Sequence, residues 1–444
     1  MNGFIVMPYL MNGLYLLGLI LVSPWLVWKW LTTSKYRRGL LTKFMGLVPT
    51  LSTHPHRVWF HAVSVGEVLL LKPVLTRIRM YRPDWECVVS VTTQSGMEVA
   101  TKTYPDLKVF YFPFDFSWAI RRALKRIQPR MIVLAELELW PNLISLAHRR
   151  GVKLALMNGR LSERSFKGYK RIRFLVKHWL AKLHLIAMQN QVYADRILAL
   201  GAPANRVHVT GSVKFDGVYG DRENFKTMQL ARQLGLEEIE GERKPLIFIA
   251  GSTQEPEEQL ALDIYKRAKP IFPELRLILV PRHPERFDAV AKLIHQAGLP
   301  LQRRSQVMPG LSFDEAVILV DTMGELNAVW GLADVAFVGG SLCDRGGQNM
   351  IEPAAYGASV LFGPNVWNFQ DVVDRLLENQ AAIQVQNGLE LETQVLRLLG
   401  DETSRHDLGI KASQFVLSQH GAADRTLYLL QSLFTPQSWF YKAA

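Results

Sequence analysis

Short apolar runs alternate along the first half of the chain with longer segments of helical period. The runs that are typical of buried strands cover 58–63, 87–91, 131–135, 154–157 and 185–188. Segments such as 68–81 and 143–150 separate them and carry apolar residues at helical spacing. The repeated order of strand, helix and strand predicts a parallel sheet with helices on both faces.

The pattern is interrupted once and then starts again. Residues 211–226 contain Gly211, Gly217 and Gly220 among mixed charges, which is typical of a linker. Five further predicted strands follow, at 246–250, 275–280, 316–320, 335–338 and 359–362. We therefore expect two Rossmann-like α/β domains that face a central cleft, with ligands at the carboxyl ends of the strands.

The N-terminal segment has a different pattern. Residues 2–28 contain no charged side chain, and about twenty apolar residues suffice for a helix to cross a bilayer. The basic residues that follow place the body of the protein in the cytoplasm; they are Lys29, Lys35, Arg37, Arg38 and Lys43. Trp25, Trp28 and Trp30 fall where interfacial aromatic residues belong. The segment predicts a single membrane-anchor helix, and a hairpin that enters one leaflet is the alternative.

Length and composition agree with an anchored globular protein. The 444 residues are 48% hydrophobic and 21% charged, which excludes a disordered or collagen-like chain. We expect an anchor over 1–34, an α/β domain over 35–215 and a second over 216–444, whose last helix can pack back on the first domain. Two cysteines, Cys87 and Cys343, exclude a disulfide scaffold or a cysteine-rich zinc site and suit a reducing compartment.

The net charge of +12 is divided unevenly between the two halves. Residues 1–220 hold 31 Lys and Arg against 11 Asp and Glu, a net charge of +20. Residues 221–444 hold 21 against 29, a net charge of −8. A basic half favours an anionic partner such as a membrane or a phosphorylated substrate, and a solvated basic surface is the alternative. The acidic half argues against a protein that coats nucleic acid.

Two acidic motifs follow predicted strands of the first domain. Glu67 ends the segment His61-Ala62-Val63-Ser64-Val65-Gly66-Glu67, where it is either a general base at the cleft or an ordinary acid in the first helical turn. Glu136 and Glu138 follow the run 131–135 at a strand end, where unpaired charge is costly. One of these two is a candidate site residue, and the other can pair with Arg160 or Arg164.

Lys214 lies at the junction of the two predicted domains. A lysine beside a cleft can stabilise developing negative charge or bind a phosphate, and a solvated linker lysine is the alternative.

The second domain carries the candidate anion site. Glycine-rich segments at 339–341 and 346–353 follow a predicted strand and suit phosphate binding by backbone N–H groups. Asn349 and Glu352, three residues apart, can instead form a helix cap. Arg282, at another strand end, can bind phosphate or carboxylate with its planar guanidinium group. The chain lacks the P-loop pattern and the usual metal-binding patterns, so we expect chemistry without a metal ion or a cofactor.

Several of these motifs occur together in one family. The chain carries, in order, H-A-V-S-V-G-E, E-L-E-L-W-P-N, N-G-R-L-S-E-R-S, G-S-V-K-F-D, P-R-H-P-E-R-F, D-T-M-G-E-L and G-G-S…G-G-Q-N-x-x-E-P. Over about residues 35–420 it resembles the bacterial 3-deoxy-D-manno-octulosonic acid (Kdo) transferases. The resemblance implies a GT-B glycosyltransferase that moves Kdo from CMP-Kdo to the 6-hydroxyl of a tetraacylated lipid A precursor, with inversion and without a metal.

The resemblance also implies roles for particular residues. Glu67 would deprotonate the acceptor hydroxyl, and Glu136 and Lys214 would stabilise the transition state. The CMP-Kdo site would be lined by Arg282, His283, Met323, Gly324, Glu325, Gly340, Ser341, Asn349, Met350, Ile351 and Glu352. The implied location is the cytoplasmic face of the bacterial inner membrane, where the partners are the lipid A precursor and anionic lipids rather than nucleic acid.

One position departs from the family pattern. The family usually carries His before the asparagine of the glycine-rich loop, where this chain has Gln348. Because Gln cannot become cationic, we expect donor affinity or its pH dependence to differ. Two other functions stay open at this point: a GT-B transferase that uses a UDP-sugar on a lipid acceptor, and a non-catalytic, membrane-tethered binder of nucleotide sugars.

Overall fold

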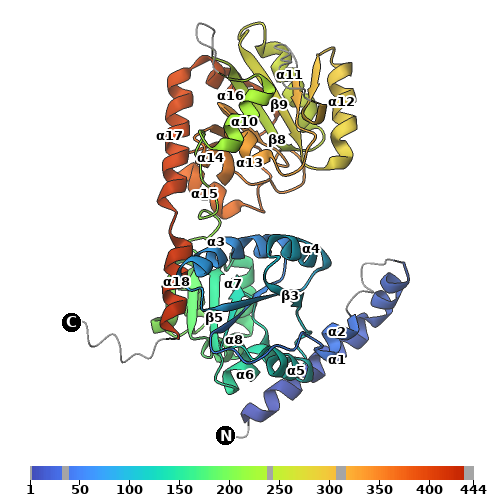
Figure 1. Cartoon of the computed structure of the whole chain (residues 1–444), viewed down its shortest axis with the longest axis vertical. Helices are drawn as coiled ribbons and strands as arrows, with labels where there is room; N and C mark the ends of the chain where they lie inside the picture. The colour runs from blue at the N-terminus through green and yellow to red at the C-terminus, as the bar shows by residue number, and fades with distance from the viewer. Residues whose placement is uncertain (1–2, 33–39, 238–243, 307–316, 435–444) are drawn as a thin grey trace, which may run out of the picture. The chain divides into compact units, whose positions relative to one another are not determined.

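The computed structural model describes residues 3–32, 40–237, 244–306 and 317–434. The chain forms two compact units. The N-terminal unit consists of Met1–Gly217 and His420–Ala444, and the C-terminal unit consists of Val218–Gln419. The last helix, α18 (Ala422–Ser432), therefore belongs to the N-terminal unit, where it packs beside α3 (Val65–Tyr81) (Figure 1).

The N-terminal unit is built on a seven-stranded parallel sheet. Its strands are β1 (Arg57–Ala62), β2 (Glu86–Val91), β3 (Lys108–Tyr111), β4 (Met131–Ala135), β5 (Lys153–Gly159), β6 (Leu185–Met188) and β7 (Val207–Val209). They lie in the order β3-β2-β1-β4-β5-β6-β7, so the direction of winding reverses between β1 and β4. In sheets of this kind, ligands bind at the carboxyl ends of the strands beside that reversal.

Helices cover both faces of this sheet. Besides α3 and α18, they are α1 (Gly3–Thr32), α2 (Leu40–Met45), α4 (Gln94–Thr103), α5 (Ser117–Ile127), α6 (Pro141–Arg149), α7 (Glu163–Arg171), α8 (Arg173–Leu180) and α9 (Gln191–Ala199). One core joins α5, α6, α8 and α9 through residues such as Ile120, Ile144 and Leu180. The other joins α3 and α18 through residues such as Leu71 and Leu427. The sheet is thus buried on both sides, which explains the nearly continuous apolar character of its central strands.

The N-terminal helix α1 packs on the unit through polar side chains. Asn12 donates from Nδ2 to Ser117 Oγ (2.8 Å) and accepts from the Ser117 N–H group (2.9 Å). Tyr15 donates its hydroxyl proton to Asp115 (3.0 Å). No helix in the described part of the chain has both the length and the apolar character needed to cross a membrane. The predicted membrane anchor is therefore still a prediction.

Of the basic residues that follow the apolar segment, the structure describes the side chain of Lys43. Its ammonium group donates to the Thr92 carbonyl (2.7 Å) and lies over the ring of Tyr111. The side chains of Lys29, Trp25 and Trp30 and the residues Lys35, Arg37 and Arg38 lie outside the described part.

The C-terminal unit repeats the architecture with a second seven-stranded parallel sheet. Its strands are β8 (Leu246–Thr253), β9 (Leu275–Pro281), β10 (Leu301–Arg303), β11 (Val317–Leu319), β12 (Val335–Val338), β13 (Ser359–Phe362) and β14 (Ile383–Gln384). Their order is β10-β11-β9-β8-β12-β13-β14, with the reversal between β8 and β12. Its helices are α10 (Phe225–Leu234), α11 (Glu257–Ala268), α12 (Phe287–Gln296), α13 (Leu326–Trp330), α14 (Ile351–Ala355), α15 (Gln370–Glu378), α16 (Gly388–Gly400) and α17 (Glu402–Ser418).

The prediction of two α/β units with parallel sheets is confirmed, and the ten predicted strands are present within a few residues of their expected bounds. The four strands missed from the sequence are β3, β7, β10 and β14, which form the two edges of each sheet. Edge strands are short and only partly buried, so their sequences lack the continuous apolar run that identifies a central strand.

Candidate active site

Glu67 and Glu136 flank the point where the N-terminal sheet reverses. Glu67 lies in the first turn of α3, which follows β1, and Glu136 comes directly after β4. Strands β1 and β4 are hydrogen-bonded neighbours in parallel register. The two acidic motifs are far apart in sequence, but they meet at the edge of the sheet where ligands bind in this fold.

Glu67 is a buried acid inside a helix cap. It is only 8% exposed. Its carboxylate accepts hydrogen bonds from the Val63 N–H group (2.8 Å) and the Ser64 hydroxyl (3.0 Å), while its own N–H group donates to Ser64 Oγ (3.3 Å). Burial raises the pKa of Glu67 in spite of these donors, and the charge of Glu136 adds to the rise. The cap and a base of raised pKa are therefore compatible in one residue.

The backbone at Glu136 is strained. Its φ of 54° lies in the left-handed region, which a glutamate rarely adopts. The Glu136 N–H group donates to the Met157 carbonyl (2.9 Å), which continues the pairing of β4 with β5 for one more residue. Strain of this kind persists only where the surroundings impose it, and it is concentrated at functional sites.

Glu138 completes a cluster of three carboxylates. Burial, together with the negative charges of Glu67 and Glu136, raises the pKa of Glu138 to about 7. Like charges at short range oppose one another's ionisation, which agrees with the raised pKa values of Glu67 and Glu138. Because Glu138 shares this site with the two predicted residues, it is a third site acid rather than only a partner for a nearby arginine.

The raised pKa of Glu138 predicts a pH-dependent stability. A carboxyl group with a higher pKa in the folded state binds its proton more tightly there, so the free energy of unfolding falls as the pH rises from the ordinary carboxyl range to about 7. The E138Q variant has no such proton to lose. We expect its Tm relative to wild type to increase between about pH 5 and about pH 8. The control is E98Q at an exposed acid of α4, and parallel Tm curves for E138Q and wild type would contradict the assignment.

Lys214 lies on a segment that is tied to the unit at both ends. On one side, the Val213 N–H group donates to Asn158 Oδ1 (3.1 Å) at the end of β5. On the other side, the buried Asp216 carboxylate accepts from the N–H groups of Gly421 and Ala423 at the start of α18. Lys214 itself is half-buried between these ties. The segment belongs to the same unit as Glu67 and Glu136.

In the C-terminal unit, one buried carboxylate organises the glycine-rich loop after β12. Glu257, in the first turn of α11, accepts hydrogen bonds from the N–H groups of Gln254, Gly340, Ser341 and Leu342 at 2.7–3.0 Å. Burial raises its pKa, and the four backbone donors oppose that rise. Glu257 was not predicted as a site residue from the sequence. Its only local signal was an acidic residue in the first turn of a helix that follows a strand.

The residues of this loop have different roles. Ser341 is fully buried, and its hydroxyl donates to the Val338 carbonyl (2.6 Å) and accepts from the Gly363 N–H group (2.8 Å). Gly340 has a φ of +69°, and a Cβ atom there would lie 3.2 Å from Gln348 Nε2. Ser341 therefore shapes the loop, and Gly340 is one of the positions where the backbone needs glycine.

Asn349 and Glu352 form a small network at the start of α14. Asn349 donates from Nδ2 to the Glu352 carboxylate (2.9 Å) and accepts from the Ile351 N–H group (3.1 Å). Burial raises the pKa of Glu352, whereas the bond from Asn349 and the positive charge of Arg282 lower it. Arg282 therefore lies within electrostatic range of this network. Met350 and Ile351 are buried.

The remaining predicted donor residues have separate surroundings. His283 and Met323 are exposed, and Gly324 has a φ of +90°. Glu325 accepts hydrogen bonds from Arg304 (3.0 Å) and from the Thr322 hydroxyl. Arg282, Asn349 and Glu352 are thus brought together, and the hydrogen bonds of Glu325 go to Arg304 and Thr322 instead.

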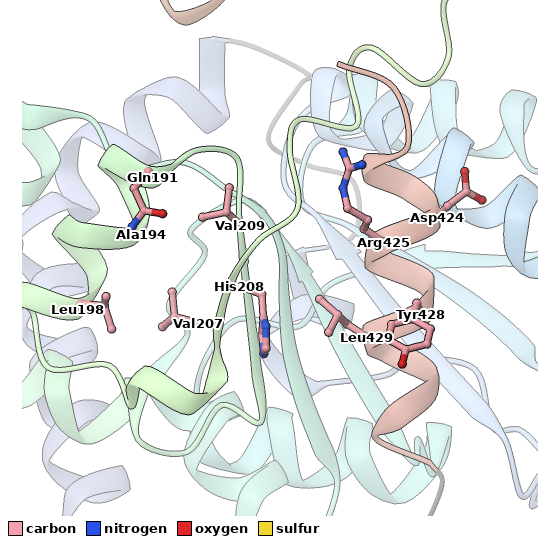
Figure 2. A pocket seen from close by; sticks show the side chains of 10 residues that line it. All are labelled: Gln191, Ala194, Leu198, Val207, His208, Val209, Asp424, Arg425, Tyr428 and Leu429. Carbon is pink, nitrogen blue, oxygen red and sulfur yellow. The ribbon is translucent and has the colours of Figure 1, made fainter. Parts of the chain in front are cut away.

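A cavity in the N-terminal unit is lined by none of the predicted site residues. It has a volume of about 720 Å³ and is lined by α9, the edge strand β7 and α18 (Figure 2). Leu198, Val209 and Leu429 give it a largely apolar wall. Among the described residues, no group of three or more His, Cys, Asp or Glu side chains is arranged to hold a metal ion. That no metal or cofactor takes part stays a prediction.

Comparison with known proteins gives consistent matches. A family model described as 3-deoxy-D-manno-octulosonic-acid transferase (kdotransferase) matches residues 36–217. A 3-deoxy-D-manno-octulosonic acid transferase from Haemophilus influenzae is 33% identical over 90% of this chain and 92% of its own length. One from Bordetella pertussis is 31% identical over 95% and 99%. The solved UDP-GlcNAc 2-epimerase from Neisseria meningitidis, at 13% identity, covers 85% of this chain and 100% of its own with a TM-score of 0.58, a likeness of fold alone.

Proposed function

The chain belongs to the family of Kdo transferases, and from this premise we propose how its residues carry out the transfer. The protein is a glycosyltransferase that transfers Kdo in lipopolysaccharide synthesis. We propose that the N-terminal unit takes a lipid A precursor and that the C-terminal unit takes CMP-Kdo. Membership of this transferase family argues against the alternative of a non-catalytic binder of nucleotide sugars.

Glu67 is the proposed general base. Its carboxylate takes the proton of the acceptor 6-hydroxyl as the hydroxyl oxygen forms a bond to the anomeric carbon of Kdo. The bond from that carbon to the CMP phosphate breaks, and CMP leaves with the electron pair. Attack from the face opposite to CMP inverts the anomeric centre. The buried environment, which raises the pKa of Glu67, makes it a stronger base than a solvated carboxylate.

Glu136 and Lys214 are the proposed stabilisers of the transition state. Glycosyl transfer develops positive charge on the sugar ring and negative charge on the departing phosphate. A carboxylate held in place by a strained backbone suits the first charge, and a lysine on a segment tied at both ends suits the second. Both groups are positioned before the reaction, so little reorganisation is needed when the charges form.

CMP-Kdo is proposed to bind at the carboxyl ends of β9 and β12. Arg282 follows β9, and its guanidinium group can pair with the phosphate. The glycine-rich loop after β12 and the Asn349–Glu352 network offer hydrogen-bond donors and acceptors for the nucleotide. The remaining proposed contacts come from His283, Met323, Gly324 and Glu325.

The observation that carries this proposal is the meeting of three carboxylates beside the reversal of the N-terminal sheet. The test is a transfer assay with freshly generated CMP-Kdo and a tetraacylated, bisphosphorylated lipid A precursor. The expected product is a 6-linked, inverted Kdo glycoside, formed equally well in the presence of a metal chelator. Transfer from a UDP-sugar but not from CMP-Kdo would contradict the proposed donor.

Helix α1 is proposed to hold the protein at the inner membrane, with the catalytic units on the cytoplasmic face. Its described apolar side chains are largely exposed; they include Leu10, Leu14, Leu17, Leu19, Ile20, Leu21 and Val22. The contacts of Asn12 and Tyr15 fix the helix to the unit while these side chains stay uncovered. Apolar side chains that the protein leaves in water gain free energy when they enter the acyl region of a leaflet.

A triple variant tests this membrane contact. Changing Leu17, Ile20 and Leu21 to Ser is expected to lower the partition coefficient for vesicles that contain phosphatidylglycerol by at least about tenfold, because each side chain contributes apolar transfer energy. The measurement is co-sedimentation with the vesicles, with circular dichroism to check folding. The control changes Ile271 and Leu389, two exposed apolar residues of the C-terminal unit, to Ser. Equal vesicle binding by the triple variant and wild type would count against the anchor.

A further inference from the structure

Asn158 is a buried polar residue of the N-terminal unit for which the proposed reaction has no role so far. It lies near the carboxyl end of β5 and is 0% exposed. Its sequence motif, N-G-R-L-S-E-R-S, contributed to the family resemblance but offered no chemical reason for an asparagine. Its surroundings supply such a reason: its position beside Glu136, its hydrogen bond from Val213 and its amide nitrogen, which has no partner among the described residues.

Asn158 lies beside Glu136 on the neighbouring strand. Ala135 of β4 is paired with Met157 of β5, so Glu136 and Asn158 are the next residues on neighbouring strands. Both have a φ of 54°, in the left-handed region. The backbone thus leaves regular strand geometry at two neighbouring positions on the same level of the sheet, and both positions carry a polar residue.

Asn158 also contacts the segment that carries Lys214. The Asn158 side-chain oxygen accepts the hydrogen bond from the Val213 N–H group (3.1 Å), one residue before Lys214. The main-chain carbonyl of Asn158 accepts from Gln189 Nε2 (3.0 Å), which holds the strand end from the other side. Asn158 therefore connects the end of β5, next to Glu136, to the segment that carries Lys214.

The side-chain nitrogen of Asn158 lacks a hydrogen-bond acceptor among the described residues. This Nδ2 atom is itself buried. A buried N–H₂ group without an acceptor is costly, and structures retain such a group where it has a function. Asn158 is completely buried. The carboxylate of Glu136, at the neighbouring register position, is therefore the acceptor that the position of Asn158 suggests.

We propose that Asn158 is a positioning residue of Kdo transfer, whose side-chain oxygen holds the Lys214 segment and whose N–H₂ group donates to the Glu136 carboxylate during the reaction. This inference rests on the roles proposed above for Glu136 and Lys214. One carboxamide would then set the distance between the two groups that stabilise opposite charges. Neither a carboxylate nor a hydrocarbon side chain can supply both hydrogen bonds.

Two substitutions separate the two halves of the proposal. N158D keeps an oxygen that can accept from Val213, but it has no N–H₂ group to donate. N158G keeps the left-handed backbone, which glycine adopts freely, and removes both hydrogen bonds. We expect kcat to fall on the order of 10- to 100-fold in both variants, with the KM values for both substrates changed less than about twofold. The control for added charge is N205D. Asn205 is exposed and precedes β7, so it lies at the amino ends of the strands, whereas Asn158 lies near their carboxyl ends.

Hydrogen–deuterium exchange provides a measurement that does not depend on activity. In the segment 211–216, we expect faster exchange in N158G and unchanged exchange in N158D. A wild-type kcat in N158D would overturn the role of the N–H₂ group, and unchanged exchange in N158G would overturn the hold on the Lys214 segment. If N158D fails to fold, a wild-type kcat in N158G overturns the proposal by itself. If wild type transfers no Kdo while the exchange results are as expected, it is the proposed function that fails.

Discussion

The Glu67→Gln variant is expected to lose at least about 10²-fold in kcat for Kdo transfer, while its fold and its affinity for CMP stay close to those of wild type. Glutamine can still accept the hydrogen bond from the Val63 N–H group, and Glu and Gln both serve in helix caps of this kind. It cannot take a proton from the acceptor hydroxyl. The substitution therefore removes the base and leaves most of the cap in place.

A second cap in the chain provides a matched control. Glu390, in the first turn of α16, accepts from the Gln386 N–H group (2.8 Å), and its own N–H group donates to the N-cap residue Asn387 (3.0 Å). This repeats the arrangement of Val63, Ser64 and Glu67. We expect E390Q to have wild-type activity and a small change in Tm. A loss of transfer in E67Q that is matched in E390Q would point to the cap rather than to a base.

The pH dependence of wild type adds a second readout for Glu67. Because burial raises the pKa of Glu67, the acidic limb of kcat/KM is expected above the ordinary carboxylate range. Activity falls as the pH decreases through that pKa, since only the ionised carboxylate can accept the proton. Equal activity of E67Q and wild type across the pH range would mean that another group is the base.

The Glu257→Ala variant is expected to lose on the order of 3–5 kcal/mol in the free energy of unfolding of the C-terminal unit, together with CMP binding. The change leaves four backbone N–H groups, those of Gln254, Gly340, Ser341 and Leu342, without their acceptor in a buried place. The glycine-rich loop then has no anchor on α11. Urea denaturation and calorimetric titration with CMP measure the two effects.

The control for this variant lies on the same helix. Asp263 accepts one hydrogen bond from the side chain of Gln259 (2.8 Å), a pair that spans one turn of α11. We expect D263A to cost only about 0.5 kcal/mol, the usual value for such pairs, and to leave CMP binding unchanged. If E257A were as stable as D263A, the loop would be held by other contacts and the assigned role of Glu257 would be wrong.

The comparison of sequence and structure is clearest at the ends of the strands. The runs at 58–63 and 131–135 identified β1 and β4, and the motifs after them pointed to Glu67 and Glu136. For each residue, the local sequence left a structural and a functional interpretation side by side. In the structure, the Glu67 carboxylate caps α3 and also belongs to a buried acidic cluster. Its role as the base is still a proposal.

Glu257 and Asn158 show what the sequence did not reveal. The hydrogen-bond donors to Glu257 include residues more than eighty positions later in the chain, and the donor to Asn158 comes from Val213. Neither residue belongs to a local pattern of apolar and polar positions. Their importance depends on which loops the parallel sheets bring together at the carboxyl ends of the strands.

The sequence by itself determined the two α/β units, their central strands and the family, because strand burial, helical period and ordered motifs are properties of neighbouring residues. Only the tertiary structure decided that Glu67, Glu136 and Glu138 share one acidic environment, that Glu257 holds the glycine-rich loop and that Asn158 ties the segment next to Lys214, at Val213, to the end of β5. The reason is physical. A pKa and a buried hydrogen bond depend on distances between groups that are remote in sequence, and the order of strands in the sheet sets those distances.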